Sequence, residues 1–416
     1  MGIDNFQDFQ DFAKREICNF AKEHVNEDTA RLLLSAARYP AVDMPAAVQQ
    51  IEGLRMAAEK WPSLLNNEEF LYPPRLNREQ ASSEATARYK ASLIAHHSSL
   101  TTVADLTGGM GIDSLALATV AGHVDYVERD PQLCTLMEHN CKALGTDNVS
   151  VHCGDSLEWL EHHDRFDLIF IDPARRDKGG RKVAAFEDCT PDLLHALSLL
   201  RSKGQRMLVK ASPMIDITLA LRQLGTVAEV HVVAVKGECK EVLFLCDSVH
   251  DGSAVVHCIN LSTLSIQNTP TTQNTLTFTL SEEAAAEPRY CTAAGHYLYD
   301  PHAALRKAGC FRLLGQRYGL PLIGPDSHLY TSDLLVPDFP GRTFEVLREV
   351  KLNKKDITEA LPDGKAHVVV RHFPTEAAAL QRQLGLREGG DLFVVATTVG
   401  TRRTAFLCCL CLPPAA

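Results

Sequence analysis

The feature that most constrains the fold is a regular alternation of strand-like and helix-like segments between residues 102 and 247. Apolar runs such as FDLIFID alternate with stretches whose apolar residues recur at helical spacing. This pattern predicts an α/β fold with a mostly parallel sheet and helices on both faces. Only KGECK separates the last two runs, EVHVVAV and EVLFLCD. That spacer is too short for a crossover helix, so these runs are expected to form an antiparallel hairpin.

The segments outside this alternation differ in character. SEEAAAEP is expected to be a linker, and PHAALRKAGCFRLLGQRYG to be helical. The predicted regions are residues 1–80 as an N-terminal helical region, 81–248 as the sheet domain, 249–330 as a connecting β segment with a small α/β, ferredoxin-like subdomain, and 331–416 as a final α/β module.

Length and composition exclude several classes of protein. A chain of 416 residues predicts two to four domains. The net charge of −10 argues against indiscriminate coating of nucleic acid, although a local basic groove stays compatible with it. The first twenty residues lack the basic and apolar regions of a secretory signal, and no apolar run reaches about 18 residues, so neither a leader nor a membrane span is expected. The thirteen cysteines, an odd number, indicate reduced thiols in a cytoplasmic protein, and no metal is expected; CCLC at 408–411 is the one weak candidate for a soft metal.

The stretch VADLTGGMG places three glycines between a strand and a helical pattern. Such a turn usually holds a nucleotide, because glycines let the backbone approach a ligand closely. The dinucleotide fingerprint fits only in part, since Ser114 stands where its third glycine belongs. Asp105, directly before the glycines, would repel a pyrophosphate and attract an ammonium group. The turn therefore favours S-adenosylmethionine, which carries an ammonium and a sulfonium but no phosphate.

On these residues the chain resembles the class I S-adenosylmethionine-dependent methyltransferases, with Thr107 in place of the more usual first glycine of DLTGGMG. The resemblance implies a Rossmann-like seven-stranded sheet, whose reversed last strand belongs to the predicted hairpin, and S-adenosylmethionine as cofactor. It also implies that Glu128 holds the ribose hydroxyls and that Asp155 reaches the adenine amine. The cofactor-binding residues expected on this basis are Asp105, Thr107, Gly108, Gly109, Gly111, Glu128, Arg129, Asp155 and Ser156.

The candidate reaction centre is Asp172-Pro173-Ala174-Arg175, at the end of the fourth strand, which faces the sulfonium in this family. The sequence resembles the (N/D)PP(Y/F) and DPPR motifs of amino-group and RNA-base methyltransferases, but it lacks the second proline and the aromatic residue. Asp172 and the Pro173 carbonyl could orient a substrate nitrogen, and Arg175 could pair with a phosphate. The alternative is structural, with Asp172 capping a loop and Arg175 forming an ion pair with Glu187 or Asp188.

Basic residues crowd the loop that follows. The expected substrate contacts are Arg176, Lys178, Arg181 and, at the end of the fifth strand, Lys210. In an acidic chain they indicate a phosphate-bearing substrate, unless the loop is merely solvated. A second chemistry is methylation of pyrimidine carbon 5, for which Cys239 would be the nucleophile if Lys236 or Lys240 lowered its pKa.

The order of segments resembles a group of bacterial methyltransferases that end in a THUMP-like domain. That resemblance implies an RNA substrate, tRNA or rRNA, with one base unstacked for reaction. The sequence therefore predicts a methyltransferase of a base nitrogen in structured RNA. A protein or metabolite methyltransferase and a non-catalytic S-adenosylmethionine- or RNA-binding protein are the alternatives. The C-terminal basic residues considered as RNA contacts are Arg342, Arg348, Lys351, Lys354, Lys355, Arg371, Arg402 and Arg403.

Overall fold

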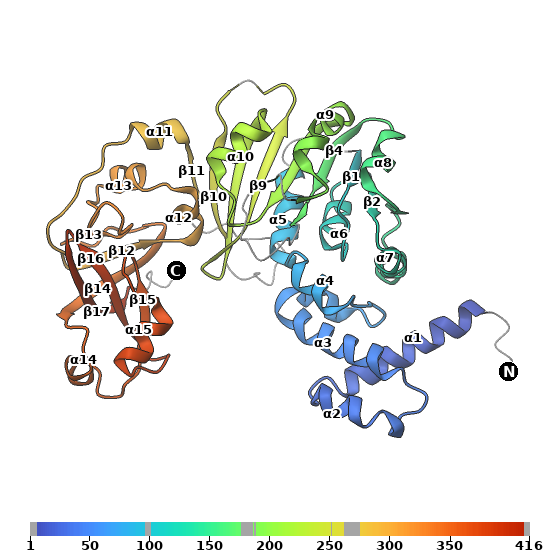
Figure 1. Cartoon of the computed structure of the whole chain (residues 1–416), viewed down its shortest axis with the longest axis horizontal. Helices are drawn as coiled ribbons and strands as arrows, with labels where there is room; N and C mark the ends of the chain where they lie inside the picture. The colour runs from blue at the N-terminus through green and yellow to red at the C-terminus, as the bar shows by residue number, and fades with distance from the viewer. Residues whose placement is uncertain are drawn as a thin grey trace. The chain divides into compact units, whose positions relative to one another are not determined.

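Figure 1 shows the chain as a computed structural model, which describes residues 6–95, 101–175, 186, 189–250, 252–261 and 275–411. The chain separates into two compact units. One contains residues 1–228, 243–251 and 263–270, and the other contains residues 229–242, 252–262 and 271–416. One large sheet contributes strands to both units.

The first unit begins with the expected helical region. Its helices are α1 (Phe6–Glu23), α2 (Thr29–Leu34), η1 (Ala36–Arg38), α3 (Met44–Lys60), η2 (Pro62–Asn66), α4 (Arg75–Gln80) and α5 (Glu84–Ala95). Asp43 starts α3 by accepting a hydrogen bond from the backbone amide of Ala46 at 3.1 Å. Phe20, Leu32 and Ile51 join α1, α2 and α3 in one apolar core. Within the described part of the chain, no helix is long and apolar enough to cross a membrane.

The large sheet has the strand order β11-β10-β8-β9-β7-β4-β1-β2-β3. Strands β2, β1, β4 and β7 pair in parallel with one another in that order. The expected hairpin is confirmed, because only the left-handed residues Lys236 and Gly237 separate β8 from β9. The elements from this region are β1 (Thr102–Asp105), α6 (Ile112–Ala118), β2 (His123–Glu128), α7 (Pro131–Leu144), β3 (Val149–Cys153), α8 (Ser156–Glu161), β4 (Phe166–Ile171), α9 (Leu193–Lys203), β7 (Gly204–Ala211), α10 (Ile217–Leu224), β8 (Val227–Val235) and β9 (Glu238–Asp247).

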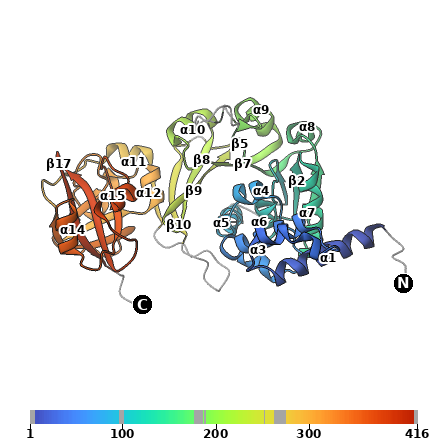
Figure 2. The same ribbon diagram turned by 60° about the horizontal axis from the view of Figure 1, so that its bottom comes forward.

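Two further strands extend the seven that were expected. β10 (Val255–Leu261) pairs in parallel with β8, and β11 (Leu276–Thr279) pairs antiparallel with β10. Every second residue of β11 is buried, as the alternation in NTLTFTL predicts. Figure 2 shows β10 in one sheet with β8 and β9, and the strand order places β8 between the other two.

The C-terminal part of the chain forms a second sheet of six strands, in the order β13-β12-β14-β17-β16-β15. Leu298, Phe344 and Phe406 lie in its apolar core. Its elements are β12 (Tyr297–Pro301), α12 (Ala303–Ala308), α13 (Arg312–Tyr318), β13 (Tyr330–Ser332), β14 (Gly341–Val350), α14 (Lys354–Ala360), β15 (His367–Val370), α15 (Ala377–Leu384), β16 (Leu392–Val399) and β17 (Arg402–Leu410).

One local expectation is wrong for an identifiable reason. SEEAAAEP does not form a linker but contributes to helix α11 (Leu280–Ala285), because Thr279 and Glu282 make a complete capping box. The stretch after residue 301 is helical, as expected, and forms the two helices α12 and α13. Gly309 adopts a left-handed conformation, with φ of 75°, and ends α12 there.

Candidate active site

The glycine turn joins β1 to α6 and has little freedom to vary. Gly111 is the N-cap of α6 with a left-handed backbone, φ 81°. A side chain at Gly108 would lie 2.2 Å from the ring of Tyr126 on β2. Around Gly109, by contrast, the nearest atom to an added Cβ is the Thr107 carbonyl oxygen at 3.8 Å. Packing excludes a side chain at Gly108, whereas Gly109 has a left-handed backbone, φ 54°, with little around its Cβ position.

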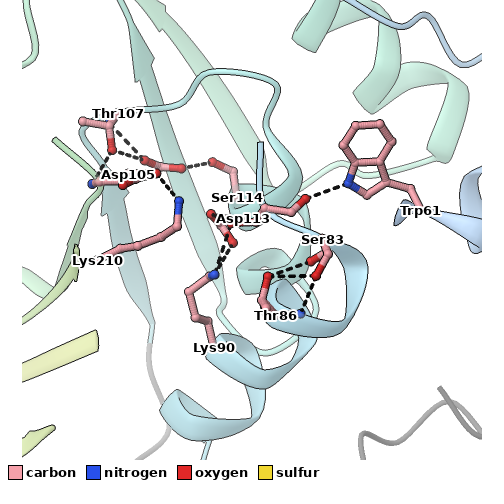
Figure 3. Close-up of polar contacts among 11 residues, drawn as sticks. Trp61, Ser83, Thr86, Lys90, Asp105, Thr107, Asp113, Ser114 and Lys210 are labelled. Atoms are coloured by element: carbon pink, nitrogen blue, oxygen red, sulfur yellow. Dashed lines mark hydrogen bonds and ion pairs between the residues drawn. The ribbon is translucent and has the colours of Figure 1, made fainter. Parts of the chain in front are cut away.

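Asp105 ends β1 with its carboxyl group buried beneath the turn (Figure 3). It accepts hydrogen bonds from the backbone amide of Thr107, at 3.0 Å, and from the hydroxyl of Ser114. Burial raises the pKa of Asp105 to about 7, although these two hydrogen bonds oppose the shift. A cation beside this carboxyl would favour its charged form, so the position suits a ligand with a positive group.

Glu128 ends β2 and contacts the same turn. Its carboxylate accepts the backbone amide of Gly109 at 2.9 Å and that of Asp130 at 3.0 Å. Tyr126 donates its hydroxyl to the Gly109 carbonyl at 2.7 Å. These contacts bring Glu128 and the glycine turn together, as the sequence predicts. The neighbouring Arg129 is exposed.

Asp155 lies where β3 leads into α8. Its carboxylate accepts the amides of Leu157 and Glu158, at 2.9 and 3.1 Å, and so caps α8, whose first residue is Ser156. Cys153, two residues earlier, pairs with Glu128 across β2 and β3. Asp155 thus lies at the same end of the parallel strands as Glu128, and it is exposed.

Asp172 follows β4 and is linked to the glycine turn. Its backbone amide donates to the Thr107 hydroxyl at 2.7 Å, and its carboxylate accepts the Lys210 ammonium from β7. The sequence reading placed Lys210 against substrate phosphate, whereas the structure pairs it with Asp172. Pro173 is buried. The backbone of Arg175 belongs to the short strand β5 (Ala174–Arg175), which pairs with β6 (Cys189–Thr190).

Several of the predicted site residues lie outside the part of the chain that the structure describes. The side chain of Arg175 and the whole of Arg176, Lys178 and Arg181 are not among the described residues. The proposed partners of Arg175, Glu187 and Asp188, lie outside them too.

A buried polar network that the sequence reading missed lies beside the turn. The Lys90 ammonium, inaccessible to solvent, lies 3.1 Å from a carboxylate oxygen of Asp113 on α6. Ser82 donates its hydroxyl to the other oxygen at 2.7 Å, and Trp61 donates its indole N–H to the Ser82 carbonyl at 2.7 Å. Burial alone would raise the pKa of Asp113, but Lys90 and Lys210 hold it below its ordinary value. Lys90 lies among the buried residues of α5 (Figure 3), and its sequence context alone does not indicate that burial.

The start of α5 serves packing in this structure. Ser83 accepts the Thr86 amide at 3.2 Å and caps the helix. Glu84 accepts the Ser63 amide at 3.0 Å and pairs with Arg88. These contacts account for both residues without a ligand.

The structure bears on the nucleophile hypothesis for Cys239 and places the cysteines of the CCLC run. Burial raises the pKa of the Cys239 thiol to about 11 despite the opposing charge of Lys307, which disfavours a nucleophilic thiolate. Lys240 is paired instead with Glu238 at 2.6 Å. In the CCLC run, Cys408 is buried, and the Cys409 thiol lies 3.6 Å from Glu345.

Comparisons with known proteins agree with this architecture. A ferredoxin-like domain family matches residues 297–340, and a THUMP domain-like family matches residues 341–409. The chain is 28% identical over 339 residues to an uncharacterised S-adenosylmethionine-dependent methyltransferase of Mycobacterium tuberculosis, covering 79% of this chain and 86% of the relative.

Two other relatives bear on the site. The crystal structure of a presumed methyltransferase from Porphyromonas gingivalis W83 is 32% identical with a TM-score of 0.80, covering 95% of this chain and 97% of that one. A ribosomal RNA small subunit methyltransferase J from Chromobacterium violaceum is 31% identical over 126 residues, which cover 27% of this chain and 48% of the relative.

Proposed function

Because this chain belongs to the class I S-adenosylmethionine-dependent methyltransferases with a C-terminal THUMP-like domain, we propose that it methylates a base nitrogen of structured RNA in the cytoplasm. tRNA is the first substrate to test and rRNA the second. The observation that carries the proposal is the link from Asp172 to the glycine turn through the 2.7 Å hydrogen bond to Thr107. It joins a candidate nitrogen-orienting group to a candidate cofactor turn.

The cofactor assignment fits the residues at the turn. Asp105 would receive the ammonium group, since a nearby cation offsets the burial that raises its pKa. Glu128 and Asp155, at adjacent strand ends, would bind the ribose and the adenine. Thr107, Gly108, Gly109 and Gly111 would form the wall beside the methionine part, with Arg129 and Ser156 at its edge. When bound, S-adenosylmethionine supplies an activated methyl group.

The residues of this chain would orient the acceptor nitrogen. The Asp172 carboxylate and the Pro173 carbonyl would accept hydrogen bonds from the substrate nitrogen and direct its lone pair. Lys210 would act as a positioning residue, because its ion pair holds the Asp172 carboxylate. Asp172 is also the nearest candidate to receive the proton that the nitrogen loses. Arg175, Arg176, Lys178 and Arg181 would contact RNA phosphates.

The THUMP-like domain supplies exposed positive charge for RNA. Of its basic residues, Arg342 and Arg371 instead surround the buried Asp300, and Arg402 pairs with Glu349 at 2.6 Å. Arg348, Lys351, Lys354, Lys355 and Arg403 are exposed, as are Arg342 and Arg402. The THUMP-like family match and the ribosomal RNA methyltransferase relative support RNA as substrate.

A transfer assay tests the chemistry. The purified chain is incubated with methyl-labelled S-adenosylmethionine and separate pools of RNA, protein and metabolites from cells that lack the gene. We expect label in RNA, a loss of at least about a hundredfold in Asp172→Asn, within the range typical of acid–base groups, and unchanged transfer in the exposed control Asp164→Asn. Label confined to protein or metabolites would overturn the RNA proposal.

Salt dependence tests the RNA surface separately. Each lost phosphate contact should lower the slope of log affinity against log salt by about 0.7 to 0.9. Lys354→Gln with Lys355→Gln should therefore flatten the slope by about 1.5. The control Arg402→Gln should leave it unchanged, because Arg402 is engaged by Glu349. Equal slopes for all three proteins would exclude this surface as the RNA contact.

A further inference from the structure

Two histidines and a glutamate gather on one face of the large sheet, and none of them belongs to the proposed methyl-transfer site. Glu229 and His231 are two residues apart on β8, so their side chains point to the same face. His257 on β10 lies directly opposite His231 in the strand register. β8 and β10 lie side by side in Figure 2. Strand pairing therefore brings together three side chains that the sequence separates.

The three side chains converge through the atoms that bind metals. The Nε2 atoms of His231 and His257 lie 2.8 and 3.7 Å from the same Glu229 carboxylate oxygen. The two rings stack at 4.5 Å with an interplanar angle of 5°. One ligand atom from each residue can be chosen so that all three lie within 4.8 Å of one another. Within the described residues, no other group of histidine, cysteine, aspartate and glutamate meets that condition.

The surroundings hold His257 in a suitable orientation. Thr277 on β11 is paired with His257, and its hydroxyl lies 3.4 Å from the other ring nitrogen, Nδ1. A metal-binding histidine commonly engages a second group through its other nitrogen, which fixes the ring and its tautomer. With the Nδ1–H of His257 donating to Thr277, Nε2 would be the nitrogen that binds a metal ion.

We propose that Glu229, His231 and His257 bind one divalent transition-metal ion of the zinc type. Zinc–nitrogen bonds of 2.0–2.1 Å in a tetrahedral site place ligand atoms about 3.3 Å apart. The contacts of 2.8 and 3.7 Å lie on either side of that separation, so small side-chain rotations complete the site. Two imidazoles and one carboxylate suit zinc, cobalt or nickel better than magnesium or calcium.

The site would have a structural role with an open position. Three protein ligands leave a fourth coordination position. The side chains of Glu229 and His257 are 22% and 25% exposed, so water can reach it, whereas His231 is only 4% exposed. A bound ion would link β10 to β8 and so fasten the two strands added to the methyltransferase sheet.

The chain contains its own comparison cluster. On β2 and β3, His123 and His152 both face Asp125, with Nε2–Oδ1 distances of 3.6 and 2.7 Å. This cluster also has two histidines and one carboxylate, here an aspartate, but these three residues do not meet the 4.8 Å condition. A variant at Asp125 therefore controls for weak binding of metal to surface histidine and carboxylate.

The test uses the full chain, freed of metal with a chelator and kept reduced. Zn²⁺ binding is measured by calorimetry and Co²⁺ binding by visible absorption, in which thiolate ligation shows as strong near-ultraviolet charge transfer. We expect one ion per chain without that charge-transfer band. Glu229→Gln and His257→Ala should each weaken binding by about tenfold or more, and Asp125→Asn should leave it unchanged. Glu229→Gln preserves shape, and unchanged metal-free melting of either variant shows that folding is intact.

Three results would overturn the proposal. They are no binding by the parent chain at 1 mM metal, a thiolate spectrum for Co²⁺, and affinities of Glu229→Gln and His257→Ala equal to that of Asp125→Asn. In each case the cluster would be a hydrogen-bonded histidine stack that binds no metal.

Discussion

Lowering the pH below 7 should weaken the binding of S-adenosylmethionine, because Asp105 must lose a proton to receive the ammonium group of the cofactor. Burial of its carboxyl raises the pKa of Asp105 from 3.8 to about 7 in the free protein. The neutral acid therefore predominates below pH 7, and the carboxylate above it. Each pH unit below 7 adds about 1.4 kcal/mol to the cost of forming the carboxylate. At pH 5 the cofactor should accordingly bind about a hundredfold more weakly than at pH 8.

The stability of the free protein should follow the same titration. The folded state holds the Asp105 proton more tightly than the unfolded state, so the carboxyl opposes folding above about pH 7 and loses that effect as the pH falls towards 4. Bound cofactor should offset part of this destabilisation above pH 7, since a neighbouring cation lowers the pKa of the carboxyl.

Calorimetry between pH 5 and pH 8.5 would measure the effect. Asp105→Asn should bind the cofactor more weakly and without the inflection near pH 7. S-adenosylhomocysteine keeps the ammonium but lacks the sulfonium charge, so its binding should show the same inflection in the parent chain. A flat profile for both ligands in the parent chain would refute the assignment of Asp105 to the ammonium group.

Other substitutions test the glycine turn and the two buried ion pairs. Gly109→Ala should cost about 1 kcal/mol of stability, because its φ is 54°, and should weaken cofactor binding. Gly108→Ala should instead lower stability by about 1–3 kcal/mol, because its new Cβ would lie 2.2 Å from the ring of Tyr126. Thermal melting would measure the stability of both variants, and calorimetry their cofactor binding. Lys90→Met should cost about 3–5 kcal/mol by leaving Asp113 buried and unpaired, and adding Asp113→Asn should recover most of it in urea titrations followed by tryptophan fluorescence. Burial alone would raise the pKa of Asp300, but three arginines hold it below its ordinary value. Asp300→Asn should therefore increase hydrogen exchange in β12 and β14 at pH 7. The difference from the parent chain should shrink as the pH falls below about 4, where Asp300 itself becomes protonated.

Local patterns were sufficient to predict the central fold and the arrangement of the turn. The five-residue spacer KGECK admits a hairpin and no crossover helix, and the structure has that hairpin. Asp105 before the glycines and Glu128 at the end of β2 meet at the turn because parallel neighbouring strands end at the same edge. Their roles in binding stay predictions.

Features that depend on distant pairing were not predictable in the same way. Lys90 and Asp113 lie on different helices, and neither local sequence predicts their ion pair. His231 and His257 become neighbours only because β10 joins the sheet beside β8. The pairing of Lys210 with Asp172 likewise follows from the adjacency of β4 and β7, which set a basic residue beside the acid. The capping box at Thr279 was local and could have been recognised.

The most direct test of the central claim is nucleoside mass spectrometry of tRNA and rRNA from cells with and without the gene. The account predicts one methylated base that disappears on deletion, returns with the parent chain and fails to return with Asp172→Asn at equal protein level. Its methyl group should lie on nitrogen. Identical nucleoside profiles in all strains would contradict RNA as the substrate, and a methyl group on carbon or ribose would contradict the nitrogen chemistry assigned to Asp172.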